Sequence, residues 1–521
     1  MSRTPSWRSV CDSEDILADT GVCADIDGKQ VALFRVDDVV YALDNLDPAS
    51  GAHVLSRGIV GDLGGEIVVA SPIYKHHFSL ATGRCLEEPQ YSVDTYPVRV
   101  IAGKVWIQGQ SQRRGRSWAK RRLVVIGNGM AGMRTVEELL KIAPDKYDIE
   151  IFGAEPGGNY NRILLSPVLA GEKRVEDIML HSLAWYRDQG VMLHNGDPAV
   201  AIDRVRRRVT SQTGAEVSYD RLLIATGSKP IVLPVAGRDL PGVVTFRDLE
   251  DVSTMLQAAR EYSRAIVIGG GLLGLEAANG LRSQGMQVTV VHLLDRLMER
   301  QLDPAAADLL KRSLEQQGLK FKMSAATSAI LGTSRVNRVR FGDGTELQAD
   351  LVVMAVGIRP NVELAQLACL RCERGVLVDD TMLTYDPCIY AVGECVQHRN
   401  STFGLVAPLW EQARVCAAHL AEIGLARFPG SLLTAQLKVT GINVFSAGNF
   451  EDTARSESLV FRDAKRGIYK RLVLEDDKVR GAVLYGDTTD GPWYVELMTE
   501  GRRIGPLREK LLFGEAVAAA S

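Results

Sequence analysis

Two glycine-rich loops carry the clearest chemical signal in this chain of 521 residues. The first has three glycines in G-x-G-x-x-G spacing, at Gly127, Gly129 and Gly132. It follows an apolar run at 123–126 and precedes a helix expected at 133–142. Such glycines permit a tight turn and the close approach of a pyrophosphate, while the helix N-terminus attracts phosphate. Glu155 follows the next expected strand, where an acid holds ribose hydroxyls, so the pattern predicts a dinucleotide site.

The second loop repeats the pattern later in the chain, with glycines at Gly269, Gly271 and Gly274. Its next expected strand, 287–291, ends at His292, where the first copy has an acid. An acid there favours NADH because it bonds ribose hydroxyls and repels a 2′-phosphate, so a histidine removes that discrimination. Arg296 is close enough in sequence to contact a phosphate, and a tolerated surface substitution at His292 is an equal interpretation. The choice between NADH and NADPH therefore stays open.

The elements around the loops alternate apolar strands, glycine turns and helices, which is typical of parallel α/β layers. Residues 1–110 differ, since short β-rich runs separated by turn signals predict a small antiparallel β-sandwich. This stretch has nine Lys or Arg against fifteen Asp or Glu, a balance of −6. After residue 401, strands expected at 436–439, 443–447, 469–474 and 481–485 and a helix at 492–499 predict an α+β cap. The tail, 514–521, is expected to fray.

The expected fold class is therefore multidomain α/β. The expected segments are a β-sandwich module at 1–110, a basic linker at 111–121, a first dinucleotide-binding domain at 122–240 and 349–400, a second at 241–348, and a C-terminal reductase or interface domain at 401–521. The linker is interpreted either as a solvated connection or as a docking surface for an acidic partner or for the acidic module itself.

Composition narrows the functional classes. A net charge of −3 argues against a general nucleic-acid-binding protein. The eight cysteines do not form a disulfide framework, and no run reaches ~18 apolar residues, so a cytoplasmic protein without a membrane span is expected. Cys369 and Cys372 form a C-x-x-C, which is interpreted as two ordinary cysteines because no second pair of metal ligands accompanies them.

The middle of the chain, from about residue 122 to 400, resembles the flavoprotein reductases with two dinucleotide-binding domains. Besides both loops it has Thr226-Gly227 after a strand, Gly357 in a late apolar run, and Gly393-Glu394. The resemblance implies that the first fold and the Gly393-Glu394 loop bind FAD and that the second fold binds NAD(P)H. Glu394 departs from the aspartate usual in that family.

The N-terminal stretch resembles the Rieske-type small subunit of bacterial NAD(P)H-dependent nitrite reductase, through residues 41–58 and 69–83. A Rieske cluster needs C-x-H and C-x-x-H ligand pairs. Other residues stand at those four positions, namely Asp47, Ala49, Ser71 and Tyr74. No iron–sulfur cluster is therefore expected, despite nearby His53, His76 and His77. Docking or interdomain structure is the expected role of the module.

The remainder resembles the flavoprotein part of the large subunit of the same nitrite reductase, through 159–166, 297–303, 404–412 and 437–448. The siroheme half of that family is absent from this sequence. A similar shortened flavoprotein serves assimilatory nitrate reductases as a separate electron-transfer component. The resemblance implies that hydride passes from NAD(P)H to FAD and that electrons then leave to a nitrate or nitrite reductase catalytic subunit.

Motifs and resemblance together give two sets of expected contacts. The residues expected to hold FAD are Gly127, Gly129, Gly132, Glu155, Asn161, Arg162, Thr226, Gly227, Gly393 and Glu394. Those expected to hold the nicotinamide nucleotide are Gly269, Gly271, Gly274, Glu276, His292, Arg296 and Gly357. No catalytic acid, base or nucleophile is expected, because the cofactors exchange the hydride. Trp410 is interpreted equally as a neighbour of the flavin or as core.

Two alternatives stay open. One is a reductase for a rubredoxin, a ferredoxin or an oxygenase, which would share all the nucleotide motifs. The other is a redox-sensing flavoprotein without physiological turnover. Neither a nucleic acid nor a membrane is an expected partner, and a homodimer is left open.

Overall fold

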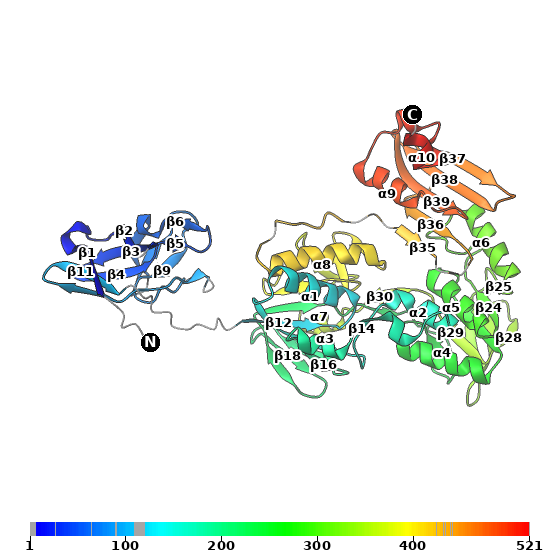
Figure 1. Ribbon diagram of the computed structural model, residues 1–521. Coiled ribbons are helices and arrows are strands. Elements are labelled where there is room, and N and C mark those ends of the chain that lie inside the picture. Colours follow the sequence, from blue (N-terminus) through cyan, green and yellow to red (C-terminus); the bar gives the residue numbers. More distant parts are fainter. Residues whose placement is uncertain are drawn as a thin grey trace. The chain divides into compact units, whose positions relative to one another are not determined.

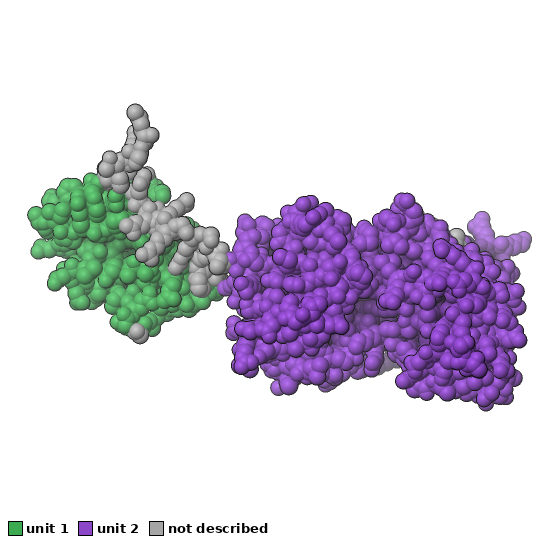
Figure 2. All heavy atoms as spheres, turned by 90° about the horizontal axis from the view of Figure 1, so that it is seen from below, with its two compact units in different colours: residues 1–119 green, residues 120–521 purple. Residues whose placement is uncertain are grey.

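Figure 1 shows the fold of the chain in a computed structural model, which describes residues 7–26, 28–63, 65–88, 91–108, 120–423, 425–430, 432, 434–437, 439 and 441–519. The chain divides into two compact units, unit 1 at residues 1–119 and unit 2 at residues 120–521 (Figure 2). Except for its last two residues, the basic segment at 111–121 lies outside the described residues. Among the described residues, no helix is long and apolar enough to cross a membrane.

Unit 1 is built from short antiparallel strands, as predicted. They are β1 (Trp7–Asp12), β2 (Thr20–Ile26), β3 (Lys29–Val36), β4 (Val39–Asp44), β5 (Leu46–Asp47), β6 (Ala52–His53), β7 (Ile59–Leu63), β8 (Glu66–Ala70), β9 (His77–Ser79), β10 (Val98–Ile101) and β11 (Lys104–Gln108). Successive side chains of a strand point to opposite faces. In β3, Val31 and Leu33 enter one hydrophobic cluster, while Ala32 and Phe34 enter the other. This strand is therefore buried on both faces.

The first sheet of unit 2 is parallel, in the order β16-β13-β12-β20-β32. Its strands are β12 (Arg121–Ile126), β13 (Tyr147–Gly153), β16 (Met192–Asn195), β20 (Arg221–Ile224) and β32 (Ile389–Ala391). Helices α1 (Met130–Ile142), α3 (Leu183–Asp188) and α8 (Val406–Leu420) contribute to the cluster on one face. Helix α7 (Glu363–Leu367) and the antiparallel strands β17 (Ala199–Asp203), β18 (Arg208–Ser211) and β19 (Glu216–Ser218) cover the other. Burial on both faces explains the continuous apolar run of β12.

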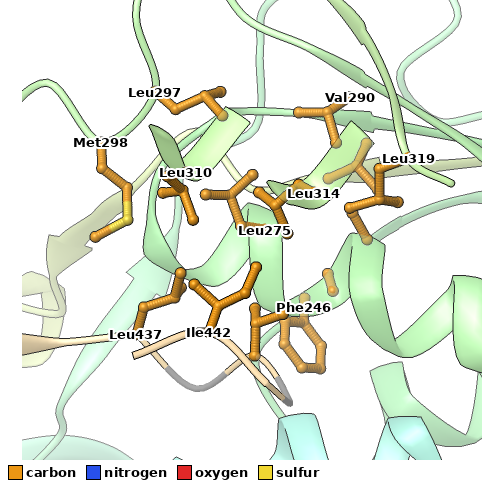
Figure 3. Packing of buried hydrophobic residues seen from close by; sticks show 14 of the residues in the cluster. Phe246, Leu275, Val290, Leu297, Met298, Leu310, Leu314, Leu319, Leu437 and Ile442 are labelled. Atoms are coloured by element: carbon orange, nitrogen blue, oxygen red, sulfur yellow. The ribbon is translucent and has the colours of Figure 1, made fainter. Parts of the chain in front are cut away.

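The second sheet repeats this order as β25-β24-β23-β29-β22, so the duplication predicted from the two loops is confirmed. Its strands are β22 (Val243–Thr245), β23 (Arg264–Ile268), β24 (Gln287–Val291), β25 (Lys320–Lys322) and β29 (Leu351–Met354). The accompanying elements are α2 (Leu165–Ala170), α4 (Leu249–Glu261), α5 (Leu272–Ser283), α6 (Pro304–Gln316), β26 (Thr327–Gly332), β27 (Val336–Phe341) and β28 (Glu346–Gln348). Figure 3 shows Leu275 of α5 and Leu310 and Leu314 of α6 packed beneath Val290 of β24.

Three small sheets of two or three short strands accompany the two parallel sheets. They are β14 (Asn159–Tyr160) with β15 (Met179–His181), β21 (Ser228–Pro230) with β30 (Ile358–Pro360), and the set β31 (Val376–Val378), β33 (Val396–His398) and β34 (Ser401–Thr402). The pairing of β21 with β30 brings together the two segments that cross between the sheets. The face of unit 2 seen in Figure 2 is hollowed near its middle.

The C-terminal part is an antiparallel sheet in the order β35-β36-β39-β38-β37 with two helices. Its elements are β35 (Thr434–Gln436), β36 (Val444–Gly448), β37 (Glu457–Asp463), β38 (Ile468–Glu475), β39 (Lys478–Tyr485), α9 (Gly491–Glu500) and α10 (Glu515–Ala519). One face packs on the second parallel domain, where the Tyr469 hydroxyl donates to Asp303 (2.7 Å) and the Tyr485 hydroxyl lies 2.6 Å from that of Ser313. The α+β cap is therefore confirmed as part of unit 2.

Two local predictions in this part are wrong, and one strand was not predicted. The strand expected at 436–439 is β35, which ends at Gln436. The edge strand β37 was missed because half its side chains are exposed and it carries charged residues at both ends. The tail was expected to fray, but it forms α10, since its alanines favour a helix and Ala518 is buried beneath the outer sheet face.

Candidate functional site

The first glycine loop joins β12 to α1, and its glycines have different surroundings. Gly127 has a φ of +114°, and a Cβ there would lie 2.2 Å from the Ala225 carbonyl oxygen. A Cβ on Gly132 would lie 2.8 Å from the Gly127 carbonyl oxygen, so helix and strand pack closely there. Gly129, the N-cap of α1, has an ordinary φ of −83°, and a Cβ there would meet nothing within 4 Å. The loop therefore leaves open space in front of Gly129, where a helix N-terminus attracts phosphate.

Glu155 follows β13, and both of its carboxylate oxygens have partners. One accepts a hydrogen bond from the Tyr160 hydroxyl (2.6 Å), and the other pairs with the Arg162 guanidinium. Arg162 also donates to the backbone carbonyl of Arg247 at 3.0 Å. Burial acts to lower the pKa of Arg162, but Tyr160 and Glu155 hold it above its ordinary value. The structure thus brings Glu155 and Arg162 together as an ion pair.

Glu394 lies in the loop after β32 and is held from two sides. Its carboxylate accepts a hydrogen bond from the Ser228 hydroxyl (2.8 Å) and pairs with Arg247. The backbone amide of Gly393 donates to the side-chain oxygen of Gln412 in α8 at 2.9 Å. Glu394, which stands where the resembled family has an aspartate, is therefore held by the Arg247 guanidinium and the Ser228 hydroxyl.

Thr226 and Gly227 lie where the chain leaves β20 for the second sheet. The Thr226 hydroxyl donates to the Asn361 carbonyl (2.7 Å), and the Asn361 amide donates to the Gly227 carbonyl (2.9 Å). A Cβ on Gly227 would lie 3.7 Å from the Arg247 guanidinium. Arg247 therefore contacts Glu394 and Arg162 and lies close to Gly227, and it was not among the residues predicted from the sequence. The neighbouring Asp248 is the N-cap of α4, since its side chain accepts a hydrogen bond from the backbone amide of Asp251. A helix start directly after Arg247 was therefore the feature that the sequence offered.

The residues present fit FAD. The side-chain oxygen of Asn159 and the side-chain nitrogen of Gln412 are buried and have no hydrogen-bond partner among the described residues. Asn159 is fixed at the glycine loop by its amide nitrogen, which donates to the Asn128 carbonyl at 2.8 Å. Buried polar atoms normally have partners, so these two point to a polar ligand. Asn161, another predicted contact, uses its side-chain oxygen to cap the turn before α2.

The second glycine loop has the same design. A Cβ on Gly269 (φ +124°) would lie 2.2 Å from the Ala355 carbonyl oxygen, and one on Gly274 would lie 2.0 Å from that of Gly269. Gly271, the N-cap of α5, has a φ of −85° and open space in front of it. Gly357, with a φ of +113°, follows β29. Both loops therefore present one unobstructed glycine at a helix N-terminus.

His292 and Arg296 lie at the far end of this loop. His292 is buried, so its interpretation as a tolerated surface substitution is wrong. Its Nδ1 accepts a hydrogen bond from the Gly270 amide at 3.0 Å. Arg296 is half-buried and has no hydrogen bond or ion pair with any residue that the structure describes. The position after β24, where the first domain has an acid, is therefore occupied by a histidine that is hydrogen-bonded to the glycine loop.

Glu276 lies on α5 and contacts α2. It is buried in α5, and its carboxylate accepts a hydrogen bond from the Ser166 hydroxyl of α2 at 2.5 Å. A cavity of about 290 Å³ lies beside the pair and is also lined by Asn279, Leu437 and Asn443. Glu276 thus links α5 to α2 next to a cavity that residues of the C-terminal part also line.

Trp410 and the C-x-x-C lie outside these loops. Trp410 is half-buried on α8, with the Arg134 guanidinium 5.7 Å from its ring centre. Cys369 is exposed, and burial raises the pKa of Cys372 to about 11. All eight cysteines of the chain are free.

In unit 1, two of the four positions predicted to have lost cluster ligands contact each other directly. Asp47 and Ser71 are completely buried, and the Ser71 hydroxyl donates to Asp47 Oδ2 at 2.6 Å. The second oxygen of Asp47 accepts from the Ala49 amide at 3.0 Å. Tyr74 is 60% exposed. Within the described part of the chain, no three His, Cys, Asp or Glu side chains are grouped to hold a metal ion.

Comparison with family models divides the chain in three. The model described as pyridine nucleotide-disulphide oxidoreductase matches residues 121–419. A Rieske-like [2Fe-2S] domain model matches residues 6–108, and a model of the rubredoxin NAD+ reductase C-terminal domain matches residues 434–502.

Individual proteins agree with these matches. A nitrite reductase [NAD(P)H] of Bacillus subtilis is 49% identical over 71% of this chain and 46% of its own length. An assimilatory nitrate reductase electron transfer subunit of the same organism is 44% identical over 75% of this chain and 51% of its own length. The chain thus spans about half the length of these relatives. The crystal structure of the covalent putidaredoxin reductase–putidaredoxin complex matches 73% of this chain and 94% of the matched chain, with a TM-score of 0.68 and 26% identity.

Proposed function

This chain belongs to the pyridine nucleotide-disulphide oxidoreductase family, and we propose that it is an FAD-dependent NAD(P)H oxidoreductase. We propose further that it passes electrons to a separate protein of nitrate or nitrite assimilation, the role that the name of the 44% identical relative gives to that protein. The observation that carries the proposal is the duplicated glycine loop, open at Gly129 in one domain and at Gly271 in the other.

The bound flavin would supply the redox chemistry, since it accepts a hydride from a nicotinamide and passes electrons on. The chain's own residues bind and orient. The first loop and α1 would receive the pyrophosphate, and Glu155 would accept from ribose hydroxyls. Arg162 and Arg247 would position the carboxylates of Glu155 and Glu394, with which they are paired. The second loop and α5 would receive the nicotinamide nucleotide. No side chain needs to act as acid or base.

The test is anaerobic rapid mixing of the flavin-loaded full chain with NADH or NADPH. We expect the flavin absorbance to bleach and to remain low when nitrite is added, because this chain would need a partner to use the electrons. Addition of a nitrate or nitrite reductase catalytic subunit is expected to restore the absorbance. Conversion of nitrite to ammonia by the chain alone, or a protein unable to take up flavin, would contradict the proposal.

A second candidate is a reductase for rubredoxin or ferredoxin, which the match at residues 434–502 favours. The same mixing experiment separates the two candidate functions. Faster reoxidation of the flavin by rubredoxin or ferredoxin than by a nitrate or nitrite reductase catalytic subunit would select the second candidate. A reduced protein that every acceptor leaves unchanged would indicate a redox sensor.

The eight free cysteines support the proposal of a reducing, cytoplasmic setting.

We also propose that unit 1 holds no [2Fe-2S] cluster, although it matches a Rieske-like domain. The Ser71–Asp47 hydrogen bond supports this, because a direct contact fills the space between two of the former ligand positions. Such a module would stabilise or dock rather than transfer electrons.

Ser71→Ala is expected to destabilise unit 1 by about 1–3 kcal/mol, because the buried Asp47 carboxylate loses its hydroxyl donor. Hydrogen exchange of the full chain, followed in peptides from residues 7–108, measures the loss. Thr20→Ala is the matched control, since it removes an exposed hydroxyl that donates to the Leu17 carbonyl and should change stability by less than about 0.5 kcal/mol.

Equal exchange in Ser71→Ala and the parent would show that the hydrogen bond contributes nothing. Metal analysis of the same preparations is expected to find no iron. Stoichiometric iron in the parent protein would refute the replacement of the cluster by this contact.

A further inference from the structure

A histidine that follows β24 contacts the second glycine loop through one ring nitrogen. The His292 side chain is 10% exposed, and its Nδ1 accepts from the Gly270 amide at 3.0 Å. A nitrogen that accepts carries no hydrogen, so the neutral ring carries its hydrogen on Nε2.

The other ring nitrogen, Nε2, is buried and has no aligned hydrogen bond among the described residues. It lies 3.2 Å from Oε2 of Glu299, but the contact is not aligned as a hydrogen bond. A hydrogen-bond donor and a carboxylate acceptor are therefore adjacent at the end of the glycine loop.

The loop and its neighbours form one rigid block. The Gly270 carbonyl accepts from the Met298 amide at 3.0 Å, which anchors the residue before Glu299. A Cβ on Gly270 would lie 2.8 Å from His292 Cγ and 2.7 Å from Leu297 Cδ2, so no side chain fits there. Leu297 and Met298 are buried in the hydrophobic cluster of Figure 3. His292 and Glu299 are thus positioned by packing beside the open Gly271.

We propose that His292 and Glu299 together bind the hydroxyls of the adenosine ribose and select NADH over NADPH, an inference that rests on the proposed function. A hydroxyl both accepts and donates, so it complements an Nε2–H donor beside a carboxylate. A 2′-phosphate would instead place its negative charge beside Glu299, which repels it. The pair therefore performs the task of the missing strand-end acid.

Arg296 defines the competing arrangement, because its unpartnered guanidinium would suit a 2′-phosphate. The experiment is calorimetric titration of the oxidised, flavin-loaded full chain with ADP-ribose and with 2′-phospho-ADP-ribose. We expect the parent to bind ADP-ribose at least about tenfold more tightly, and Glu299→Gln to reduce that preference about tenfold or more by removing the repelling charge. Arg300→Gln, an exposed charge change in the same segment, should leave the preference unchanged.

An unchanged preference in Glu299→Gln would overturn the inference. So would tighter binding of 2′-phospho-ADP-ribose by the parent, with loss of that binding in Arg296→Gln. The outcome also separates this inference from the proposed function. Equal affinity for both ligands with intact bleaching by NADH refutes only the ribose assignment, whereas selective ADP-ribose binding without bleaching refutes only the oxidoreductase. Binding of neither ligand refutes both.

Discussion

Gly129→Val is expected to give a folded protein with reduced flavin content, and Gly271→Val a yellow protein that needs about 10- to 100-fold more NADH for the same bleaching. Both positions have ordinary φ angles near −85°, and a Cβ at either meets nothing within 4 Å, so the chain itself tolerates the side chain. The valine would occupy the space that a pyrophosphate needs. Overpacking of about 1–3 kcal/mol corresponds to a loss of affinity on the order of 10- to 100-fold. Circular dichroism, flavin content and anaerobic bleaching measure the three properties.

Each variant is a control for the other, because Gly129 and Gly271 are the equivalent N-cap glycines of the two loops. Gly127→Val is the contrasting variant, since its φ of +114° and the Ala225 carbonyl 2.2 Å away should prevent folding. The opposite pair of phenotypes, with flavin lost in Gly271→Val and kept in Gly129→Val, would reverse the assignment of the two domains. Retention of flavin and of bleaching in both variants would refute pyrophosphate binding at these loops.

The glycine loops were predictable because their chemistry is local. A tight turn, a close helix contact and an open N-cap each demand a residue type at fixed spacing, and the structure puts Gly127, Gly132 and Gly129 in those three environments. The parallel strand β24 was predicted with correct ends, since its apolar run lies between the glycine of one turn and His292. Duplication helped, because a second copy of a pattern supports the interpretation of the first.

The contacts around the loops were not predictable because they join distant segments. Arg247 reaches Glu394, and Arg162 reaches the Arg247 carbonyl, yet none of these residues is near another in sequence. For His292 a surface substitution was one of two equal interpretations, whereas its ring accepts a hydrogen bond from the loop amide of Gly270. The contacts of Arg162 and Arg247 join segments from different parts of the chain, and the His292–Gly270 bond joins the ends of two neighbouring strands, so none of them appears as a local sequence pattern.

Lys470 illustrates the same gap, because a strand pattern does not show that a lysine in it is buried. Its side chain is only 6% exposed, and its ammonium lies 2.8 Å from Asp487 and 3.0 Å from Asp490. Asp490 also precedes α9 and accepts from the Glu515 amide at the start of α10. The lysine therefore ties β38 to both helices of the C-terminal part.

Lys470→Met is expected to destabilise the C-terminal part by about 3 kcal/mol, because it leaves two carboxylates facing each other without their cation. The estimate is at the low end of the range for buried ion pairs, since Asp487 is 34% exposed. Because this long chain is not expected to unfold in one step, hydrogen exchange of peptides from 468–519 is the appropriate measurement. Lys465→Met, at an exposed turn, is the control and should change exchange little. Addition of Asp487→Asn and Asp490→Asn to Lys470→Met should recover most of the lost stability. A triple variant no more stable than Lys470→Met would show that the lysine stabilises the C-terminal part by packing and not by its charge.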